Sequence, residues 1–185
     1  FKMYLENSED YFEVFTTRVD TVFWMTFVVM APEHPLVDKI TTDEDKWAVE
    51  KYKEQAKFKT QLERTELQKE KTGQFTWAYA INPFNGDKIP VYIWDYVLAN
   101  YGTGVVMAVP AHDERDFDFA HVHNIPIIQS IAPVDKNHPD YDAIARCKVC
   151  YPDKWIVVNS WEFTWLTSDE AIKKMQIWLS ERNLL

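Results

Sequence analysis

The 185-residue chain lacks the features that define several classes of protein. No apolar run approaches the roughly 18 residues that span a bilayer, and the opening Phe1-Lys2-Met3-Tyr4 has no signal-peptide layout. An initiator methionine is absent, so we expect a segment of a longer protein. Basic residues are few, because 20 Lys and Arg face 29 Asp and Glu, giving a net charge of −9. That charge argues against an autonomous, tight nucleic-acid binder, which needs Lys and Arg to neutralise phosphates.

Cysteine is almost absent. Cys147 and Cys150 form a single CxxC, which offers two thiolates where a structural zinc site needs four ligands. His121, His123 and His138 are not spaced to complete such a set. We therefore predict no metal and two reduced thiols in a surface loop, which is typical of a cytoplasmic protein.

Short strand-like runs alternate with a few helical stretches. Apolar runs and period-two alternation predict strands at residues 11–17, 22–31, 75–81, 88–94, 105–109 and 155–159, with a hairpin turn at 81–87. Helices are predicted over residues 39–71, over 114–123, and after an N-cap at Thr167 or Ser168, with an extended loop at 133–153. The pattern predicts one α+β domain over residues 1–185, mixed and β-barrel-like, with flanking helices.

Two segments concentrate the residues that carry chemistry. One is Phe-Thr-Thr-Arg-Val-Asp-Thr at 15–21, and the other is Tyr-Gly-Thr-Gly-Val-Val-Met-Ala-Val-Pro-Ala-His-Asp-Glu-Arg-Asp at 101–116. Each sets hydroxyls or charges beside an apolar strand, which favours a pocket with apolar walls and a few fixed polar groups. The residues alone favour structural roles. The threonines suit strands and turns, the carboxylates at 113–116 suit a helix first turn, and His112 suits a buried or capping position.

The second segment resembles the GTGAVMAVPAHDERD motif of leucyl-tRNA synthetase editing domains, with Val105 in place of alanine. The first is similar to the family's TTRPDT element, with Val19 in place of proline. The similarity continues in the same order through residues 63–67, 71–73, 78–83, 159–160 and 166–168. Residues 107–113 favour the leucine enzyme over its isoleucine and valine relatives. The chain is thus similar to a bacterial-type editing (connective polypeptide 1) domain.

This resemblance implies post-transfer editing, the hydrolysis of the ester bond of mischarged tRNA-Leu. The partners it implies are the 3′ end of that tRNA and the remaining domains of a parent synthetase. Editing needs no cofactor, whereas ATP and Mg²⁺ belong to the parent's synthetic site. HIGH-like and KMSKS-like motifs are absent from the sequence, so we expect no aminoacylation by this chain alone. The alternatives are a catalytically inactive module that contacts tRNA, and a free-standing hydrolase.

The resemblance also assigns roles to individual residues. Asp116 would hold the α-ammonium group of the substrate, and Thr16 and Thr17 would contact the ester, the terminal ribose or the attacking water. Thr21 would block the branched end of leucine. Met107 and Val109 would line the side-chain pocket. Supporting contacts to the substrate, the loop or the tRNA end would come from Tyr101, Thr103, Asp113, Arg18 and Arg115.

Glycine is scarce, with 4 residues against 8 tryptophans. Where the family usually has glycine, this chain has Trp24, Trp77, Trp155, Trp161 and Trp165. A glycine position with positive φ or tight packing resists so large a side chain. One hypothesis is codon reassignment, because some bacterial lineages read UGA as glycine while other codes read it as tryptophan. The alternative is five genuine tryptophans on a tolerant surface.

Overall fold

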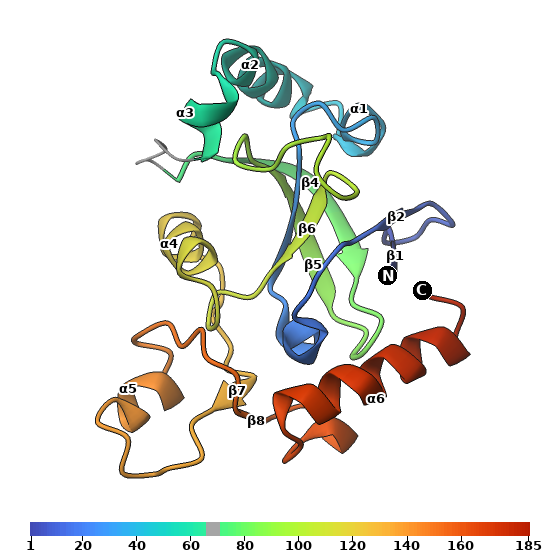
Figure 1. Cartoon of the computed structure of the whole chain (residues 1–185). Helices are drawn as coiled ribbons and strands as arrows, with labels where there is room; N and C mark the ends of the chain where they lie inside the picture. Colours follow the sequence, from blue (N-terminus) through green and yellow to red (C-terminus); the bar gives the residue numbers. More distant parts are fainter. Residues whose placement is uncertain (66–70) are drawn as a thin grey trace. The chain divides into compact units, whose positions relative to one another are not determined.

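The computed structural model describes residues 1–65 and 71–185 (Figure 1). Its contacts divide the chain into two compact units. The sheet unit contains Lys2–Phe15 and Phe27–Met107, and the C-terminal unit contains Phe1, Thr16–Thr26 and Ala108–Leu185. The expectation of a single domain over residues 1–185 remains a prediction. No helix in the described ranges is long and apolar enough to cross a membrane.

A four-stranded sheet in the order β4-β5-β3-β6 organises the sheet unit (Figure 1). Its strands are β3 (Phe27–Met30), β4 (Gln74–Ile81), β5 (Lys88–Ile93) and β6 (Val105–Ala108). The pair β4–β5 is the antiparallel hairpin that the sequence predicts, and β3 runs parallel to β5. All four residues of β3 are apolar and buried, as expected of a central strand covered on both faces. A separate antiparallel pair joins β1 (Lys2–Tyr4) and β2 (Tyr11–Glu13).

Three helices of the sheet unit replace the single helix predicted over residues 39–71. They are α1 (Val37–Ile40), α2 (Lys46–Lys57) and α3 (Gln61–Thr65), and α1 and α2 both contact β4. The first break follows Thr41, which is extended and whose hydroxyl donates to the Val37 carbonyl at 2.6 Å. A side chain that bonds its own backbone in this way competes with helix continuation. Residues 66–70 of the predicted helix, with two residues of the 63–67 motif, lie outside the described residues.

The C-terminal unit is built from short elements and two longer helices. They are η1 (Val19–Trp24), α4 (Glu114–His123), β7 (Ile131–Ala132), α5 (Tyr141–Ala145), β8 (Ile156–Val157), η2 (Trp161–Phe163) and α6 (Ser168–Glu181). Strands β7 and β8 pair antiparallel, and α6 packs against η1 (Figure 1). Three residues of α6 enter the core, namely Ala171, Met175 and Leu179.

The structure confirms the α+β class, the helix at 114–123 and the final helix with Thr167 as N-cap. In the described ranges the strands form open sheets without barrel closure. Several boundaries are wrong: the strand at 11–17 ends at Glu13, the strand at 155–159 is two residues long, and the loop at 133–153 contains α5. The strand at 22–31 begins instead as the 3₁₀ helix η1, because the NH and hydroxyl of Thr21 both bond the Arg18 carbonyl and close a turn.

Candidate active site

Residues 16–21 form a compact turn in the C-terminal unit that enters η1. The Thr16 hydroxyl oxygen accepts the Arg18 NH at 2.9 Å, and the Thr21 hydroxyl donates to the Arg18 carbonyl at 2.9 Å. Thr21 is 1% exposed, Thr16 is half-buried and Thr17 is exposed. The three threonines therefore differ: Thr21 is fixed in the interior, whereas Thr17 presents its side chain to solvent.

Arg18 clamps this turn. Its Nε and Nη2 donate to the two carboxylate oxygens of the fully buried Asp20, at 3.1 and 3.2 Å. Its Nη1 donates to the Pro152 carbonyl at 3.0 Å. A bidentate arginine–carboxylate pair fixes orientation as well as charge. These contacts favour loop support over tRNA contact as the role of Arg18.

The turn from β6 into α4 positions Asp116. Its Oδ2 accepts the Val109 NH at 2.9 Å. Asp113 is the N-cap of α4, and its side chain accepts from the backbone NH groups of Arg115 and Asp116. The Arg115 guanidinium in turn pairs with Asp113 at 3.2 Å. The Asp116 carboxyl is thus held at the end of β6 by one hydrogen bond to the backbone and by the cap of its own helix.

The charged form of Asp116 is disfavoured. Burial raises the pKa of this carboxyl to about 8, and the nearby Asp113 carboxylate adds to the rise. The Val109 NH and the Arg115 charge oppose the rise without cancelling it. A desolvated carboxyl is stabilised in its ionised form by a cation that comes into contact with it. The site is therefore suited to receive a positively charged group, and perturbed carboxyls of this kind are enriched at functional sites.

His112 is a structural residue of the C-terminal unit. It is 6% exposed, and its Nε2 accepts the NH groups of Ser130 and Ile131, each at 3.0 Å. The ring proton therefore lies on Nδ1, which donates to the Tyr151 carbonyl at 2.8 Å. Burial lowers the pKa of His112 to about 4. Every ring nitrogen is engaged, which confirms the buried structural interpretation.

Residues 151–152 hold both motif segments. The Pro152 carbonyl binds Arg18 of the first segment, and the Tyr151 carbonyl binds His112 of the second. The Tyr151 NH donates to the Ala111 carbonyl at 2.8 Å. The sequence predicts only an extended loop here. These contacts use main-chain groups that every residue carries, so no side-chain signal in the sequence points to them.

The sheet unit holds the candidates Tyr101, Thr103 and Met107, whereas Val109 is buried in the C-terminal unit. Tyr101 is 67% exposed, Met107 is half-buried in β6, and the Thr103 hydroxyl donates to the Val105 carbonyl at 3.2 Å. The glycines on either side of Thr103 have φ of 57° and 70°, the left-handed region that glycine adopts without strain. The Gly-Thr-Gly spacing is therefore a turn requirement, and it presents Tyr101 to solvent.

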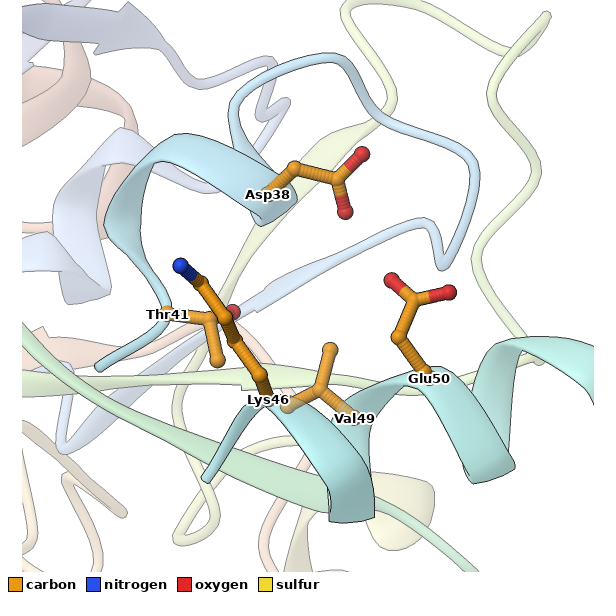
Figure 2. A pocket seen from close by; sticks show the side chains of 5 residues that line it. All are labelled: Asp38, Thr41, Lys46, Val49 and Glu50. Carbon is orange, nitrogen blue, oxygen red and sulfur yellow. The ribbon is translucent and has the colours of Figure 1, made fainter. Parts of the chain in front are cut away.

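Two hollows of the sheet unit lie apart from these candidates, because none of the predicted site residues lines either one. The larger, of about 270 Å³, is lined by Leu5, Glu6, Ser8, Asp10, Lys39, Ile40, Trp77, Ala78 and Tyr79. The smaller, of about 90 Å³, lies between α1 and α2 and is lined by Asp38, Thr41, Lys46, Val49 and Glu50 (Figure 2). Lys53 forms ion pairs with two of these carboxylates, those of Asp38 and Glu50. The smaller hollow therefore belongs to the ion-paired packing of two helices.

Cys147 and Cys150 are both free thiols. Burial raises the pKa of Cys150 to about 12, and the carboxylates of Asp113 and Glu114 on α4 add to the rise. A thiol that stays protonated is a poor nucleophile and a poor metal ligand. Within residues 1–65 and 71–185, no three His, Cys, Asp or Glu side chains are grouped to hold a metal ion.

A model of the leucyl-tRNA synthetase editing domain matches residues 1–180. The chain belongs to this family. A leucine–tRNA ligase of Clostridium beijerinckii is 52% identical over 171 residues, which cover 92% of this chain and 20% of that protein. A leucine–tRNA ligase of Clostridium tetani is 49% identical over 173 residues, which cover 94% of this chain and 20% of that protein. The editing-domain chain thus spans about a fifth of the length of these relatives.

The editing-domain chain also resembles a solved structure. In the crystal structure of the ternary complex of Agrobacterium radiobacter K84 agnB2 LeuRS, tRNA and LeuAMS, the protein matches with a TM-score of 0.73 and 29% identity. The match covers 98% of this chain and 18% of that one. The fold is therefore shared over nearly the whole chain.

Both departures from the editing-domain motifs are accommodated by the fold. Val19, where the family pattern has proline, is the first residue of η1. The first position of a helix needs no NH partner, so proline and valine are both acceptable there. Val105, in place of alanine, is 1% exposed at the start of β6, where a β-branched residue is favoured.

Proposed function

We propose that this editing domain hydrolyses the ester bond of mischarged tRNA-Leu, within a parent leucyl-tRNA synthetase. The observation that supports this most is the desolvated Asp116 carboxyl, which is fixed at the end of β6 and suited to a cation. The aminoacyl ester of a tRNA carries an α-ammonium group next to its scissile carbonyl. Binding that ammonium to Asp116 places the ester at a defined distance from the turn at residues 16–21.

The proposed reaction needs only a positioned water. The water oxygen attacks the ester carbonyl, the bond to the ribose oxygen breaks, and the water proton ends on that oxygen, which releases the free amino acid. Hydrogen bonds to the developing oxyanion supply the acceleration. Thr16 and Thr17 are the proposed donors. The Thr16 oxygen accepts the Arg18 NH, and its own O–H proton is available for the ester or the water.

Selectivity against leucine is assigned to Thr21. Its hydroxyl is held by the Arg18 carbonyl and its side chain is buried, so the methyl group has one orientation. A rigid wall can reject a branched end that a mobile side chain would admit. The pocket of the synthetic site discriminates one methylene by only about 1–3 kcal/mol, which is why a second selection is needed. Met107 and Val109 are the proposed side-chain contacts.

Deacylation by a full-length parent carrying this chain tests whether Asp116 anchors the α-ammonium group of the substrate. Isoleucyl- or norvalyl-tRNA-Leu should be hydrolysed and leucyl-tRNA-Leu spared. Asp116→Ala should lower the rate about 100-fold, because it removes a charge-assisted contact to the ammonium. Full activity in Asp116→Ala would reject the anchor role. Absence of hydrolysis by every form of the chain would instead favour an inactive module that contacts tRNA.

The proposed exclusion of leucine by the Thr21 side chain is tested with a matched pair of variants. Thr21→Ala should allow hydrolysis of leucyl-tRNA-Leu, whereas Thr21→Val should continue to exclude it because valine keeps the branched volume. Rates with isoleucyl-tRNA-Leu serve as the reference for each variant. Equal behaviour of the two variants toward leucyl-tRNA-Leu would show that volume at position 21 does not set selectivity.

A further inference from the structure

Arg64 is buried in the sheet unit although it lies on the short helix α3. It is 8% exposed, and its guanidinium makes four hydrogen bonds. Two run to the Glu33 carboxylate at 2.7 and 3.3 Å, one to the Val97 carbonyl at 2.8 Å, and one to the Asp95 carbonyl. Arginine suits this position because its planar guanidinium presents five N–H donors in a fixed geometry.

The partners of Arg64 bracket the loop at residues 98–104. The loop starts directly after Val97, and its last residue, Gly104, accepts the Ala31 NH at 2.9 Å. Ala31 lies two residues before Glu33 in the turn that follows β3. Arg64 thus binds the chain just before the loop and the turn that receives the end of the loop. Tyr101 and Thr103 lie between these two anchor points.

The surroundings leave the loop little freedom. A Cβ at Gly104 would lie 3.2 Å from the Cα of Ala99, so the two ends of the loop are in close contact. Asp95, which begins the Arg64-bound stretch, is 1% exposed. Its carboxylate accepts the Tyr52 hydroxyl at 3.0 Å and the Lys59 ammonium at 2.6 Å. The stretch that precedes the loop is therefore fixed through both its carbonyls and its carboxylate.

We propose that Arg64 is a positioning residue for editing, which holds the 98–104 loop so that Tyr101 and Thr103 meet the substrate in one arrangement. It acts through main-chain carbonyls and makes no contact with substrate. The role in catalysis rests on the proposed function, whereas the restraint on the loop does not. Lysine at this position keeps the charge and loses the planar fork, so it should not replace arginine.

Hydrogen exchange and kinetics on the full-length parent test the proposal. Arg64→Lys and Arg64→Met should speed exchange at the NH groups of Tyr101 and Gly104, which bond within the loop, by about tenfold. They should also lower kcat/KM for deacylation by about tenfold, since small misplacements of substrate contacts are costly. Lys39→Met, which removes an exposed ion pair with Asp10 in the same unit, should change neither.

The outcomes separate the two proposals. Unchanged exchange in the loop, or faster exchange throughout β3 and β5 as well, overturns the positioning role. Localised exchange with an inactive wild-type parent would retain the restraint and reject editing. Localised exchange with unchanged deacylation would show that the loop does not align substrate.

A different observation concerns three tryptophans. Trp77, Trp161 and Trp165 have φ of 61°, 44° and 72°. A bulky residue at positive φ is a genuine outlier, whereas glycine adopts this region without steric cost. The other positive-φ residues in the described ranges are mostly of types that tolerate it, namely Asn7, Asn124, Asn159, Asn183, Gly86, Gly102 and Gly104, along with Cys147.

The rings of Trp77 and Trp161 contact those of Phe75 and Phe23, with 4.9 and 5.2 Å between centroids, yet all three tryptophans are more than half exposed. Trp77, Trp161 and Trp165 are 54%, 70% and 78% exposed. Trp77 lies where the β4–β5 register shifts, a place where glycine is common in strands. The Trp165 NH donates to the Val157 carbonyl at 2.8 Å, which holds the backbone at that position. We infer that positions 77, 161 and 165 are glycine positions and that the protein in its source carries glycine there. This agrees with UGA codons read as glycine.

Thermal unfolding of single variants tests the inference. Trp77→Gly, Trp161→Gly and Trp165→Gly should each raise the unfolding midpoint by about 2–4 °C. Trp47→Gly is the matched control, because Trp47 is 74% exposed but lies inside α2, where glycine should lower the midpoint. Lower midpoints for all four variants would overturn the inference. So would UGG codons in the source gene, or tryptophan in peptides of the source protein analysed by mass spectrometry.

Discussion

Asp116, which is half-buried, and His112, which is buried, are titratable residues of one unit, and their pKa values are displaced in opposite directions. Loss of water disfavours the charged form of both side chains. The His112 ring makes three hydrogen bonds to the backbone, whereas the Asp116 carboxyl accepts one, from the Val109 NH. The raised pKa supports the proposed role of Asp116 as a binding residue, whereas the lowered pKa of His112 accompanies a core position. The same physical cause, loss of water, thus separates a proposed binding residue from a structural one only when the hydrogen bonds are considered with it.

Asp116→Asn should stabilise the domain in a pH-dependent way. The folded pKa is raised to about 8 from an ordinary value of 3.8, so folding is favoured by the proton and wild-type stability falls as pH rises between these values. The variant should be no more stable near pH 4 and more stable by about 1–3 kcal/mol near pH 8. Urea unfolding across this range measures the difference. Asp118→Asn on the same helix controls for the loss of one negative charge, and a constant offset for Asp116→Asn would contradict the raised pKa.

His112→Gln should flatten the acid side of the stability profile. The folded pKa is lowered to about 4 from 6.5, so the contribution of neutral His112 is complete above pH 6.5 and is lost as pH falls toward 4. At pH 7 the variant should be less stable by about 1–3 kcal/mol, because glutamine cannot reproduce all three bonds. Thermal midpoints at pH 7, 6 and 5 report both effects. Parallel pH profiles for the two proteins would show that His112 does not titrate on unfolding.

At the scale of elements, α6 supports the turn that carries Thr21, the proposed selectivity residue. It packs against η1, in which Thr21 lies, and it begins with a complete capping box between Thr167 and Glu170. Thr167→Ala should cost about 1–2 kcal/mol of unfolding free energy, as removal of an N-cap does. Ser180→Ala, on the exposed surface near the end of α6, should change it by less than about 0.5 kcal/mol. Urea unfolding that fails to separate these variants would mean that α6 frays without consequence for the unit.

The sequence predicts some elements well because their signals are local. Thr167 and Glu170 show the three-residue spacing of a capping box, and the start of α6 is predicted correctly. Thr60 and Glu63 have the same spacing and the same reciprocal bonds, and they mark the new start at α3. The break in the predicted 39–71 helix was therefore readable. The 3₁₀ helix η1 was not, because an apolar run with threonines fits a strand equally well until the Arg18 carbonyl is known to accept both bonds of Thr21.

The candidate site divides in the same way. Its motif residues are named from the sequence, since the resemblance carries them position by position. The residues that hold the motifs in place cannot be named from the sequence. Tyr151 and Pro152 act through their carbonyls, and Arg64 acts from a helix distant in sequence. Among these residues only Arg64 lies in a motif shared with the family, the one at 63–67. That match does not predict that the guanidinium binds the carbonyls of residues 95 and 97.

At the scale of the molecule, charge limits what the chain can do alone. A net charge of −9 repels the phosphates of tRNA, and the chain spans about a fifth of the length of its relatives. We therefore expect that most of the phosphate contacts in the parent are made by other domains. The affinity for tRNA-Leu should then be at least about 100-fold lower for the isolated chain than for the parent.

The salt dependence of binding discriminates more sharply than affinity. The logarithm of the binding constant falls with the logarithm of salt concentration by about 0.7–0.9 for each phosphate neutralised. A chain that contacts only the tRNA end should show a slope equivalent to about one or two phosphates, and the parent a much steeper one. Anisotropy titrations of labelled tRNA-Leu between about 50 and 200 mM KCl measure both slopes. Repulsion between the acidic chain and the tRNA lowers the affinity without releasing counterions. A weak complex with a shallow salt dependence is therefore expected of a domain whose substrate is held by other domains of the parent. A slope as steep as the parent's would assign the phosphate contacts to this chain, and would require a basic surface that its composition does not favour.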